Sequence, residues 1–380
     1  MKPARPIVLA AGGTGGHMFP AEALAKALAG RGHRPVLVTD RRGGTFSDGR
    51  EDVTVYRIRA AGSGGRGLVG KLRMVSELAV GTVQAMAVLR HLDPLAVVGF
   101  GGYASAPTVY AAARRGTPVV LHEQNAVLGR ANRMLARRAA RIATSFDSVA
   151  MVAPEDRAKL VRTGNPVRPA IAERRGVPYP ALDGDAPLGL VVLGGSQGAK
   201  VFPEVVPQAL AKLPEGLRRR IRLSLQARPE DLAAAQAAVA ALGLAGAEVS
   251  SFFTDVPDRL AGAHLAITRS GASTVAELTA IGRPSILVPY PSAMDDHQTA
   301  NAQAVADAGA AWLMQQPSFT AEALAERLQS LFALPASLTH AAARAQDWGT
   351  VRAAEALADV VIDLLPRSNG HHPDYKEAAE

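Results

Sequence analysis

The sequence contains no cysteine, and aromatic residues make up only 4% of its 380 positions. Without cysteine the chain cannot form disulfides, thiolate nucleophiles, zinc fingers or iron–sulfur clusters. The scarcity of aromatic rings argues against a nucleic-acid partner, because proteins that bind single strands interleave basic residues with stacking platforms. We therefore expect neither thiol chemistry nor nucleic-acid binding.

The sequence also lacks an uninterrupted apolar run of the roughly 18 to 20 residues that cross a bilayer. The longest candidate, residues 232–245, is short and includes Gln236, so we expect that the chain does not cross a membrane. Lys2 and Arg5 precede an apolar run at residues 7–11, which ends in glycines too early for a secretory signal. We interpret this run as the first strand of the fold.

What is present is typical of a folded, basic protein. Apolar residues make up 48% and charged residues 20% of the chain, a balance that disordered proteins do not have. The 42 basic and 34 acidic residues give a net charge of +8. Such a surface attracts anions, which include nucleotides, acidic lipid headgroups and nucleic acid, and charge alone does not choose among them.

Short β-branched runs alternate with Ala/Leu-rich helical stretches along almost the whole chain, which predicts an α/β fold with parallel sheets. The expected strands of the first half are residues 7–11, 36–39, 53–58, 96–98, 119–122 and 141–144. Those of the second half are residues 188–193, 222–225, 248–250, 265–268, 286–288 and 311–314.

Each half opens with a strand followed by a glycine loop, residues 11–17 and 193–199, which predicts two similar domains. We expect domains at residues 1–163 and 188–350, joined by a proline- and glycine-rich linker at 164–187. A final helix at 351–366 is free to pack on either domain, and a polar tail at 367–380 follows.

Glycine loops at the carboxyl ends of parallel strands point backbone N–H groups at anions. The two opening loops match neither the dinucleotide fingerprint nor the P-loop. A third loop, residues 268–277, predicts a helix whose first turn offers Ser273 and Thr274 hydroxyls to a diphosphate, with Glu277 one turn further on for ribose hydroxyls. In the alternative, Ser273 only caps the helix and Glu277 is a solvated surface residue.

The segment Asp295-Asp296-His297 allows two interpretations. Its acidic groups and imidazole could hold Mg²⁺ or Mn²⁺. We favour the alternative, in which the acids cap a helix amino terminus, because adjacent side chains diverge. Gln298 and Asn301 suit the hydroxyls of a sugar.

At this point the sequence resembles the MurG family, the glycosyltransferases that add N-acetylglucosamine (GlcNAc) to undecaprenyl-diphosphate-MurNAc-pentapeptide (lipid I). The resemblance is dispersed in consistent order over residues 12–17, 101–103, 122–125, 164–168, 194–199 and 269–277. It implies a GT-B fold, in which two Rossmann-like domains face a cleft, and UDP-GlcNAc as the donor, held mainly by the second domain. The resemblance also implies lipid II as the product and a place of action at the cytoplasmic face of the bacterial plasma membrane.

Carried over by position, the family's donor contacts fall on Thr14, Gly15, Gly16, Asn125, Arg168, Ser196, Gln197, Phe253, Ala272, Ser273, Thr274, Val275, Ala276, Glu277 and Gln298. Two segments depart from the family pattern. Residues 41–51 form a shorter loop, and residues 292–296 form a loop about one residue longer.

Direct displacement at the anomeric carbon needs a base. Our first choice is His17, because its position at a helix amino terminus lowers the pKa of the imidazole and keeps it a neutral acceptor. Glu123 is the second choice, whereas we expect His122 to be buried and hydrogen-bonded. Ser196, Gln197, Arg168 and the N–H groups of the third loop meet the charge of departing UDP. This scheme requires no metal or other cofactor and inverts the anomeric configuration.

The lipid-linked acceptor implies contact with an anionic membrane. Arg130, Arg133, Arg137 and Arg141 recur every three or four residues, which predicts one basic helical face. We expect this face to form a membrane patch together with neighbouring residues: Arg138, Leu68, Val69, Lys71, Leu72, Arg73 and Met74. The alternative is a solvated basic face.

Three other functions stay open at this point. They are another UDP-sugar transferase on the same fold, a UDP-GlcNAc epimerase, and, as the weakest, a non-enzymatic nucleotide- or nucleic-acid-binding protein.

Overall fold

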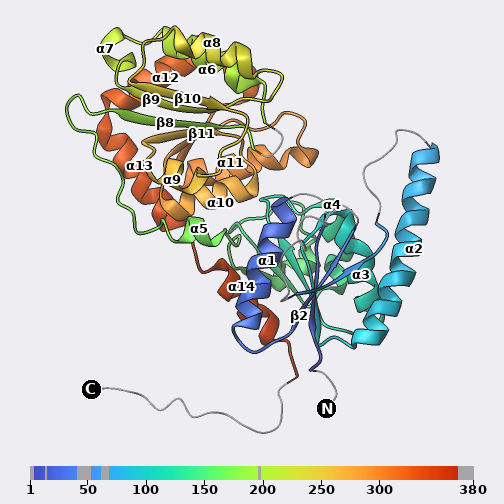
Figure 1. The fold of residues 1–380 in the computed structure, drawn as a ribbon. Helices are drawn as coiled ribbons and strands as arrows, with labels where there is room; N and C mark the ends of the chain where they lie inside the picture. The colour runs from blue at the N-terminus through green and yellow to red at the C-terminus, as the bar shows by residue number, and fades with distance from the viewer. Residues whose placement is uncertain (1–3, 13–14, 41–52, 61–67, 196–197, 367–380) are drawn as a thin grey trace, which may run out of the picture.

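The computed structural model describes residues 4–12, 15–40, 53–60, 68–195 and 198–366. It contains two parallel β-sheets, one above the other in Figure 1. We refer to residues 4–163, which carry the first sheet, as the first half, and to residues 188–352, which carry the second, as the second half. The shortened loop expected at 41–51 lies outside the described residues.

The first sheet has the strand order β3-β2-β1-β4-β5-β6-β7, and every neighbouring pair is parallel. Its strands are β1 (Ile7–Ala10), β2 (Pro35–Thr39), β3 (Thr54–Arg57), β4 (Ala96–Gly99), β5 (Val119–Glu123), β6 (Arg141–Thr144) and β7 (Leu160–Arg162).

The second sheet has the order β10-β9-β8-β11-β12-β13 and is also parallel throughout. Its strands are β8 (Leu188–Leu193), β9 (Ile221–Gln226), β10 (Gly246–Ser250), β11 (Leu265–Thr268), β12 (Ser285–Leu287) and β13 (Ala311–Leu313). In both sheets the strand order reverses beside the first strand of the half, at the β1–β4 and β8–β11 pairs. Open α/β sheets bind ligands beyond the carboxyl ends of the strands at this point.

The helices of the first half are α1 (Gly15–Ala29), α2 (Leu68–Leu92), α3 (Gly102–Arg114) and α4 (Arg130–Leu135), and α5 (Pro169–Ala172) follows in the connection. The second half contains α6 (Val201–Ala211), α7 (Glu215–Arg218), α8 (Leu232–Ala240), α9 (Val256–Ala261), α10 (Ala272–Ile281), α11 (His297–Asp307), α12 (Ala321–Ala333) and α13 (Pro335–Trp348). The last helix is α14 (Ala353–Ile362).

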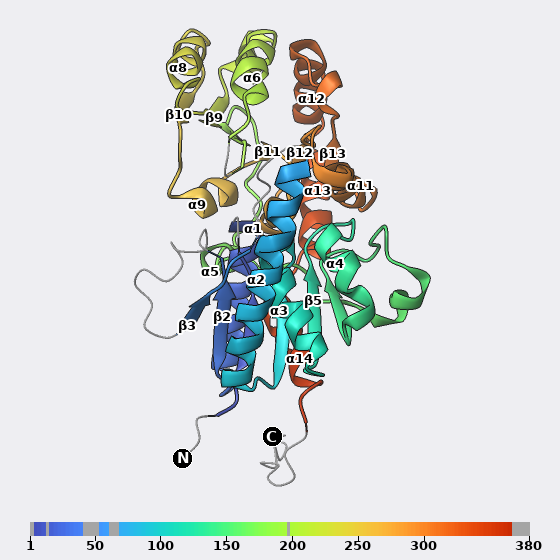
Figure 2. The same ribbon diagram turned by 90° about the vertical axis from the view of Figure 1, so that its right-hand side faces the viewer.

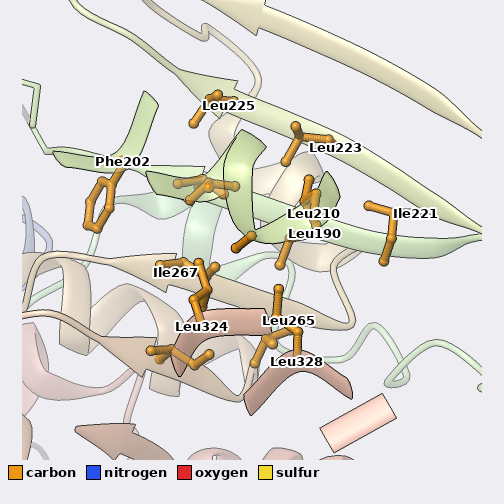
Figure 3. Packing of buried hydrophobic residues seen from close by; sticks show 14 of the residues in the cluster. Leu190, Phe202, Leu210, Ile221, Leu223, Leu225, Leu265, Ile267, Leu324 and Leu328 are labelled. Atoms are coloured by element: carbon orange, nitrogen blue, oxygen red, sulfur yellow. The ribbon is translucent and has the colours of Figure 1, made fainter. Parts of the chain in front are cut away.

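The central strands of both sheets are buried on both faces, whereas the edge strands β3, β7 and β10 are partly exposed. Alternate residues of β1 belong to different hydrophobic clusters, because successive side chains on a strand point to opposite faces. Figure 3 shows one of these clusters in the second half, where Leu190 and Leu265 from the sheet meet Leu210 and Leu324 from the covering helices. Burial of both faces explains why the central strands appear in the sequence as nearly continuous apolar runs.

The predicted strands are confirmed, with ends that differ by one or two residues. One strand, β7, was not predicted. It is only three residues long and lies at the sheet edge, so residues 160–162 are too few to show a strand pattern in the sequence.

The final helix α14 packs back on the first half. Leu357, Ala358 and Val361 are fully buried in the cluster that contains Leu24 and Leu28 of α1, and Figure 1 shows the two helices side by side. The apolar side of the final helix therefore covers the first half and completes its core.

The choice of residues 232–245 as the longest apolar candidate was wrong. Residues Leu72–Leu92 of α2 are long and apolar enough, by length and composition, to cross a membrane. Scattered polar residues such as Glu77 and Gln84 interrupt the run without lowering its mean hydropathy enough to exclude it. In the structure α2 packs along α3 on one side of the first half (Figure 2), while Leu72, Val75 and Val83 on it are more than half exposed.

Candidate active site

The site begins where the first sheet reverses its strand order. The chain leaves β1 and enters α1, so that His17 lies in the first turn of this helix. The chain leaves β4 through Gly101 and Gly102, both in the left-handed region with φ of 80° and 67°. A Cβ atom at Gly102 would lie 3.4 Å from Nε2 of His17. The two glycines therefore provide a turn and keep this face of the imidazole uncovered.

His17 is held by a neighbour on β5. Its Nδ1 lies 3.1 Å from Oε1 of Gln124. Burial lowers the pKa of His17 below its ordinary value of 6.5, while the charge of Glu123 partly opposes this shift. The expected direction is thus found, but its main cause is burial of the ring rather than the helix terminus. A neutral imidazole can accept a proton, as a general base must.

Glu123 is buried and fully engaged. Its Oε1 accepts from the backbone N–H of Asn125 at 3.0 Å and from Nδ2 of Asn125 at 3.3 Å. Its Oε2 accepts from the backbone N–H of Gly129 and from Nδ2 of Asn132, both at 2.8 Å. Four donors fill the carboxylate, so in this arrangement it orders the loop after β5.

The loop after β5 meets the second half directly. Nδ2 of Asn301, a fully buried residue of α11, donates to Oδ1 of Asn125 at 3.1 Å and to the carbonyl of Ser270 at 3.0 Å. Oδ1 of Asn301 accepts from the backbone N–H of Ala126 at 2.8 Å. One amide therefore joins the loops that follow β5 and β11, so the carboxyl edges of the two sheets face each other.

The third glycine loop forms a helix amino terminus beside this contact. Gly271 is the N-cap of α10, and no side chain caps the helix. Ser273 is therefore not the cap that the alternative interpretation required. Val275 is buried in the core, so it can offer only its backbone, whereas Ser273 and Thr274 are partly exposed. The terminus is available to an anion.

Arg168 and Glu277 form a bidentate ion pair, with Nε–Oε1 at 2.7 Å and Nη2–Oε2 at 3.0 Å. The guanidinium also lies 5.8 Å from the ring centroid of Phe19, two residues after His17. The pair thus lies between the first turn of α1 and α10. Glu277 is therefore not the solvated surface residue of the alternative interpretation.

The structure places the remaining predicted donor contacts as follows. Gln298 lies next to the third loop, since its carbonyl accepts from Oγ of Ser270 at 2.8 Å and its Oε1 accepts from the N–H of Tyr290 at 3.0 Å. Phe253 follows β10 and is buried under the guanidinium of Arg259, which places it apart from these contacts. Thr14, Ser196 and Gln197 lie outside the described residues, while Gly15 and Gly16 open α1, and Ala272 and Ala276 lie on α10.

The acidic segment has a role that neither interpretation predicted. Asp295 forms ion pairs across the halves, with Nη2 of Arg130 at 3.0 Å and Nη2 of Arg133 at 2.6 Å. Asp296 precedes α11 but makes no cap hydrogen bond to the backbone; it accepts from Oγ1 of Thr299 at 2.7 Å. Capping was therefore wrong. Among the residues that the structure describes, no group of three or more His, Asp and Glu is placed to hold a metal.

The single basic helical face was also wrong. α4 ends at Leu135, so Arg137 lies in a 3-10 turn and Arg141 lies in β6. Arg130 and Arg133 form ion pairs with Asp295 of the second half. A three- to four-residue spacing places side chains on one face only while the helix continues.

One residue with a place in the site, Gln124, received no role from the sequence, although it contacts His17. Asn301, which the sequence suggested for the hydroxyls of a sugar, is fully buried and joins the halves through both ends of its amide. Residues i and i+2 of a strand share a face, so the polar pair His122 and Gln124 at the end of a buried strand was the available signal.

The two halves match separate family models. Residues 7–144 match the glycosyltransferase family 28 N-terminal domain, and residues 189–360 match the glycosyltransferase family 28 C-terminal domain. Among solved structures, MurG of Acinetobacter baumannii superimposes with a TM-score of 0.76 at 31% identity, covering 94% of this chain and 99% of that one. A UDP-GlcNAc 2-epimerase from Neisseria meningitidis has a TM-score of 0.64 at 12% identity, which shows a shared fold alone.

Curated relatives agree over nearly the full length. A protein of Rhodospirillum centenum is 60% identical over 365 residues, which cover 96% of each chain, and one of Paramagnetospirillum magneticum is 56% identical over 364 residues, which cover 96% of this chain and 98% of the other. Both are named UDP-N-acetylglucosamine–N-acetylmuramyl-(pentapeptide) pyrophosphoryl-undecaprenol N-acetylglucosamine transferase. The chain therefore belongs to glycosyltransferase family 28 and, within it, to the MurG family of N-acetylglucosaminyltransferases with the GT-B fold.

Proposed function

We propose that this protein transfers GlcNAc from UDP-GlcNAc to the C4 hydroxyl of MurNAc in lipid I, which yields lipid II and UDP for peptidoglycan synthesis. The observation that carries the proposal is the convergence of both halves on one place. His17 and Asn125 from the first half lie beside Asn301 and the Arg168–Glu277 pair, through contacts that cross between the sheets.

In this proposal His17 is the general base. Its Nε2 removes the proton of the C4 hydroxyl while the hydroxyl oxygen attacks the anomeric carbon of GlcNAc. The bond from that carbon to the β-phosphate oxygen breaks, and its electron pair leaves with UDP. A single displacement of this kind converts an α-linked donor into a β-linked product.

The second half binds the donor in this scheme. The uncapped terminus of α10, from Ala272 to Ala276, receives the diphosphate. Glu277 accepts from the ribose hydroxyls, which frees Arg168 to meet the charge on the leaving phosphate. Thr14, Gly15, Gly16, Ser196, Gln197, Phe253 and Gln298 stay in the proposed donor site on the resemblance. Donor binding therefore replaces the Arg168–Glu277 ion pair.

We assign Glu123 a positioning role instead of the role of a second base. A base needs a free lone pair directed at the substrate, and the four donors on Glu123 come from the protein itself. Its carboxylate holds Asn125 in place for the sugar hydroxyls.

The deciding experiment is transfer of radiolabelled GlcNAc from UDP-GlcNAc to a lipid I analogue, with product linkage determined by NMR. We expect a β-1,4-linked disaccharide and equimolar UDP. Consumption of UDP-GlcNAc at the same rate without acceptor would instead indicate an epimerase, and transfer only to a different acceptor would indicate another UDP-sugar transferase.

We further propose that the protein is peripheral at the cytoplasmic face of the plasma membrane and contacts anionic lipid through α2. The half-exposed apolar residues Leu72, Val75 and Val83 and the exposed Arg73 support this surface. The side chains of Leu68, Val69 and Lys71 lie outside the described part of the chain, and Met74 is partly buried on the same helix.

Co-sedimentation with vesicles tests the membrane surface. We expect Leu72→Asp combined with Val75→Asp to abolish binding to vesicles rich in anionic lipid, while Leu334→Asp, an equally exposed apolar site in the second half, leaves it intact. Binding of the native protein that ignores both lipid charge and salt would contradict the electrostatic part of the proposal.

A further inference from the structure

His17 belongs to a chain of hydrogen bonds that runs along the end of β5. Oε1 of Gln124 lies 3.1 Å from Nδ1 of His17. Nε2 of Gln124 donates to the carbonyl of Phe100 at 3.0 Å and lies 2.9 Å from Nδ1 of His122. Nε2 of His122 in turn lies 3.2 Å from the carbonyl of Gly164. Gln124 and His122 are both buried.

The two carbonyl groups fix every proton in this chain. A carbonyl can only accept, so the amide must direct its NH₂ group to Phe100, and its oxygen then faces His17. That oxygen also only accepts, so the proton of neutral His17 lies on Nδ1. In the same way the carbonyl of Gly164 requires a proton on Nε2 of His122, which leaves Nδ1 of His122 as an acceptor. The second N–H of the Gln124 amide is shared between this Nδ1 at 2.9 Å and the backbone carbonyl of His122 at 3.2 Å.

We infer that Gln124 and His122 are positioning residues that hold His17 as its Nδ1–H tautomer and so direct the lone pair of Nε2 to the acceptor hydroxyl. The inference rests on the proposed function, because it deepens the role of His17 in that reaction. An imidazole of the opposite tautomer presents N–H to the hydroxyl and cannot remove its proton.

The surroundings keep the chain neutral. Burial lowers the pKa of His122 to about 4, so its Nδ1 stays an acceptor at neutral pH. The titratable groups of the described residues that act on His17 are Glu123 and His122, both from β5. At the start of α3 the uncharged Gly101 and Gly102 lie beside the ring.

The tautomers can be measured without any activity. In protein labelled with ¹⁵N-histidine at pH 7.5, we expect opposite tautomers for the two rings, Nδ1–H for His17 and Nε2–H for His122. His17→Gln and His122→Gln variants assign the signals. An Nε2–H tautomer of His17 would overturn the inference, and this result is independent of whether the protein transfers GlcNAc.

Substitution of Gln124 tests the inference in the transfer reaction. Gln124→Met keeps the volume but removes the hydrogen bonds, and we expect kcat/KM for the lipid I analogue to fall on the order of 10-fold to 100-fold while the Kd for UDP is unchanged. Gln346→Met, at an exposed position of α13, is the matched control. Unchanged kcat/KM in Gln124→Met would contradict the inference.

The pair His122→Asn and His122→Leu separates positioning from packing. Asn offers an acceptor oxygen near the place of Nδ1, so it should retain most of the activity, whereas Leu should lose as much as Gln124→Met does. Packing alone predicts the reverse order, because a buried strand position tolerates Leu better than Asn. A Leu variant more active than the Asn variant would therefore overturn the role of His122. Failure of native protein in the transfer assay would contradict the proposed function and leave the tautomer measurement standing.

Discussion

Glu123 and His17 interact electrostatically, yet only one of them is available for chemistry. The carboxylate accepts from four donors of its own loop, whereas the imidazole uses Nδ1 for Gln124 and has glycine on the side of Nε2. The same comparison applies to Arg168 and Glu277, which are engaged with each other until a donor separates them. At the scale of residues, free hydrogen-bonding capacity identifies the groups that act on substrate.

Replacement of the base tests this view. We expect His17→Ala to lower kcat by about 10²-fold to 10⁴-fold, the usual contribution of general base catalysis, while the Kd for UDP measured by calorimetry is unchanged. His340→Ala, at an exposed position of α13, serves as the control. Turnover within two-fold of the native rate would remove His17 from the mechanism.

The buried His122 makes stability depend on pH. Its pKa is lowered from 6.5 to about 4 by burial, so between these values the unfolded chain binds more protons than the folded one. The free energy of unfolding should therefore fall as the pH drops from 6.5 to 4, by at most about 3 kcal/mol from this group. Urea unfolding at pH 7 and pH 5 measures the change. His122→Leu should show a smaller loss, and an equal loss would assign the effect to other groups.

At the scale of elements, the central strands could be predicted because they are buried on both faces and so carry their own apolar signal. The turn at the start of 268–277 could be predicted because Ser270 and Gly271 directly follow β11. Asp295 was misinterpreted because its partners Arg130 and Arg133 are more than 160 residues away in the sequence. Local patterns contain no information about such pairs.

The role of Gln124 escaped prediction for a related reason. Its neighbours His17 and Phe100 come from the ends of two other strands, and their proximity depends on the order in which β1, β4 and β5 lie in the sheet. The family resemblance located the residue but could not state its contacts. Elements were therefore predictable from sequence, whereas contacts between elements required the structure.

The contact between α10 and the end of α13 depends on one glycine. A Cβ atom at Gly349 would lie 2.3 Å from the backbone carbon and oxygen of Thr279. We expect Gly349→Ala to destabilise the protein by about 1–3 kcal/mol, because the backbone of α10 must move. Thermal unfolding measures the loss, which Gly216→Ala in α7, where open space surrounds the glycine, should not show. Equal midpoints for the two variants would contradict this account of the packing.

At the scale of the whole molecule, the division expected from the sequence remains our proposal: two domains at residues 1–163 and 188–350 with a linker at 164–187. Two contacts between the halves, Asn301 with the loop after β5 and Asp295 with α4, and one between the linker and the second half, Arg168 with Glu277, support a hinged arrangement. All three lie on the side of the molecule where the proposed substrates bind.

Hydrogen exchange at one amide can report on the relative position of the halves. The N–H of Ala126 donates to Asn301 of the other half. We expect Asn301→Ala to speed exchange of this amide by about 5-fold or more, since the lost hydrogen bonds are worth at least ~1 kcal/mol. Gln303→Ala, an exposed position on the same helix, should leave the rate unchanged. Unchanged protection in Asn301→Ala would show that other contacts hold the halves together.

The return of α14 to the first half means that the backbone passes between the halves twice. The two passages are adjacent, since Nη2 of Arg162 donates to the carbonyl of Trp348 at 3.3 Å and a Cβ atom at Gly164 would lie 2.5 Å from Cγ2 of Thr350. Two neighbouring covalent connections define an axis between the halves. Rotation of one half about this axis opens the side of the molecule opposite the connections, whereas the connections resist sliding or twisting of one half against the other. They also make the first unit discontinuous in sequence, so a fragment that ends at residue 163 leaves the α1 surface without its cover.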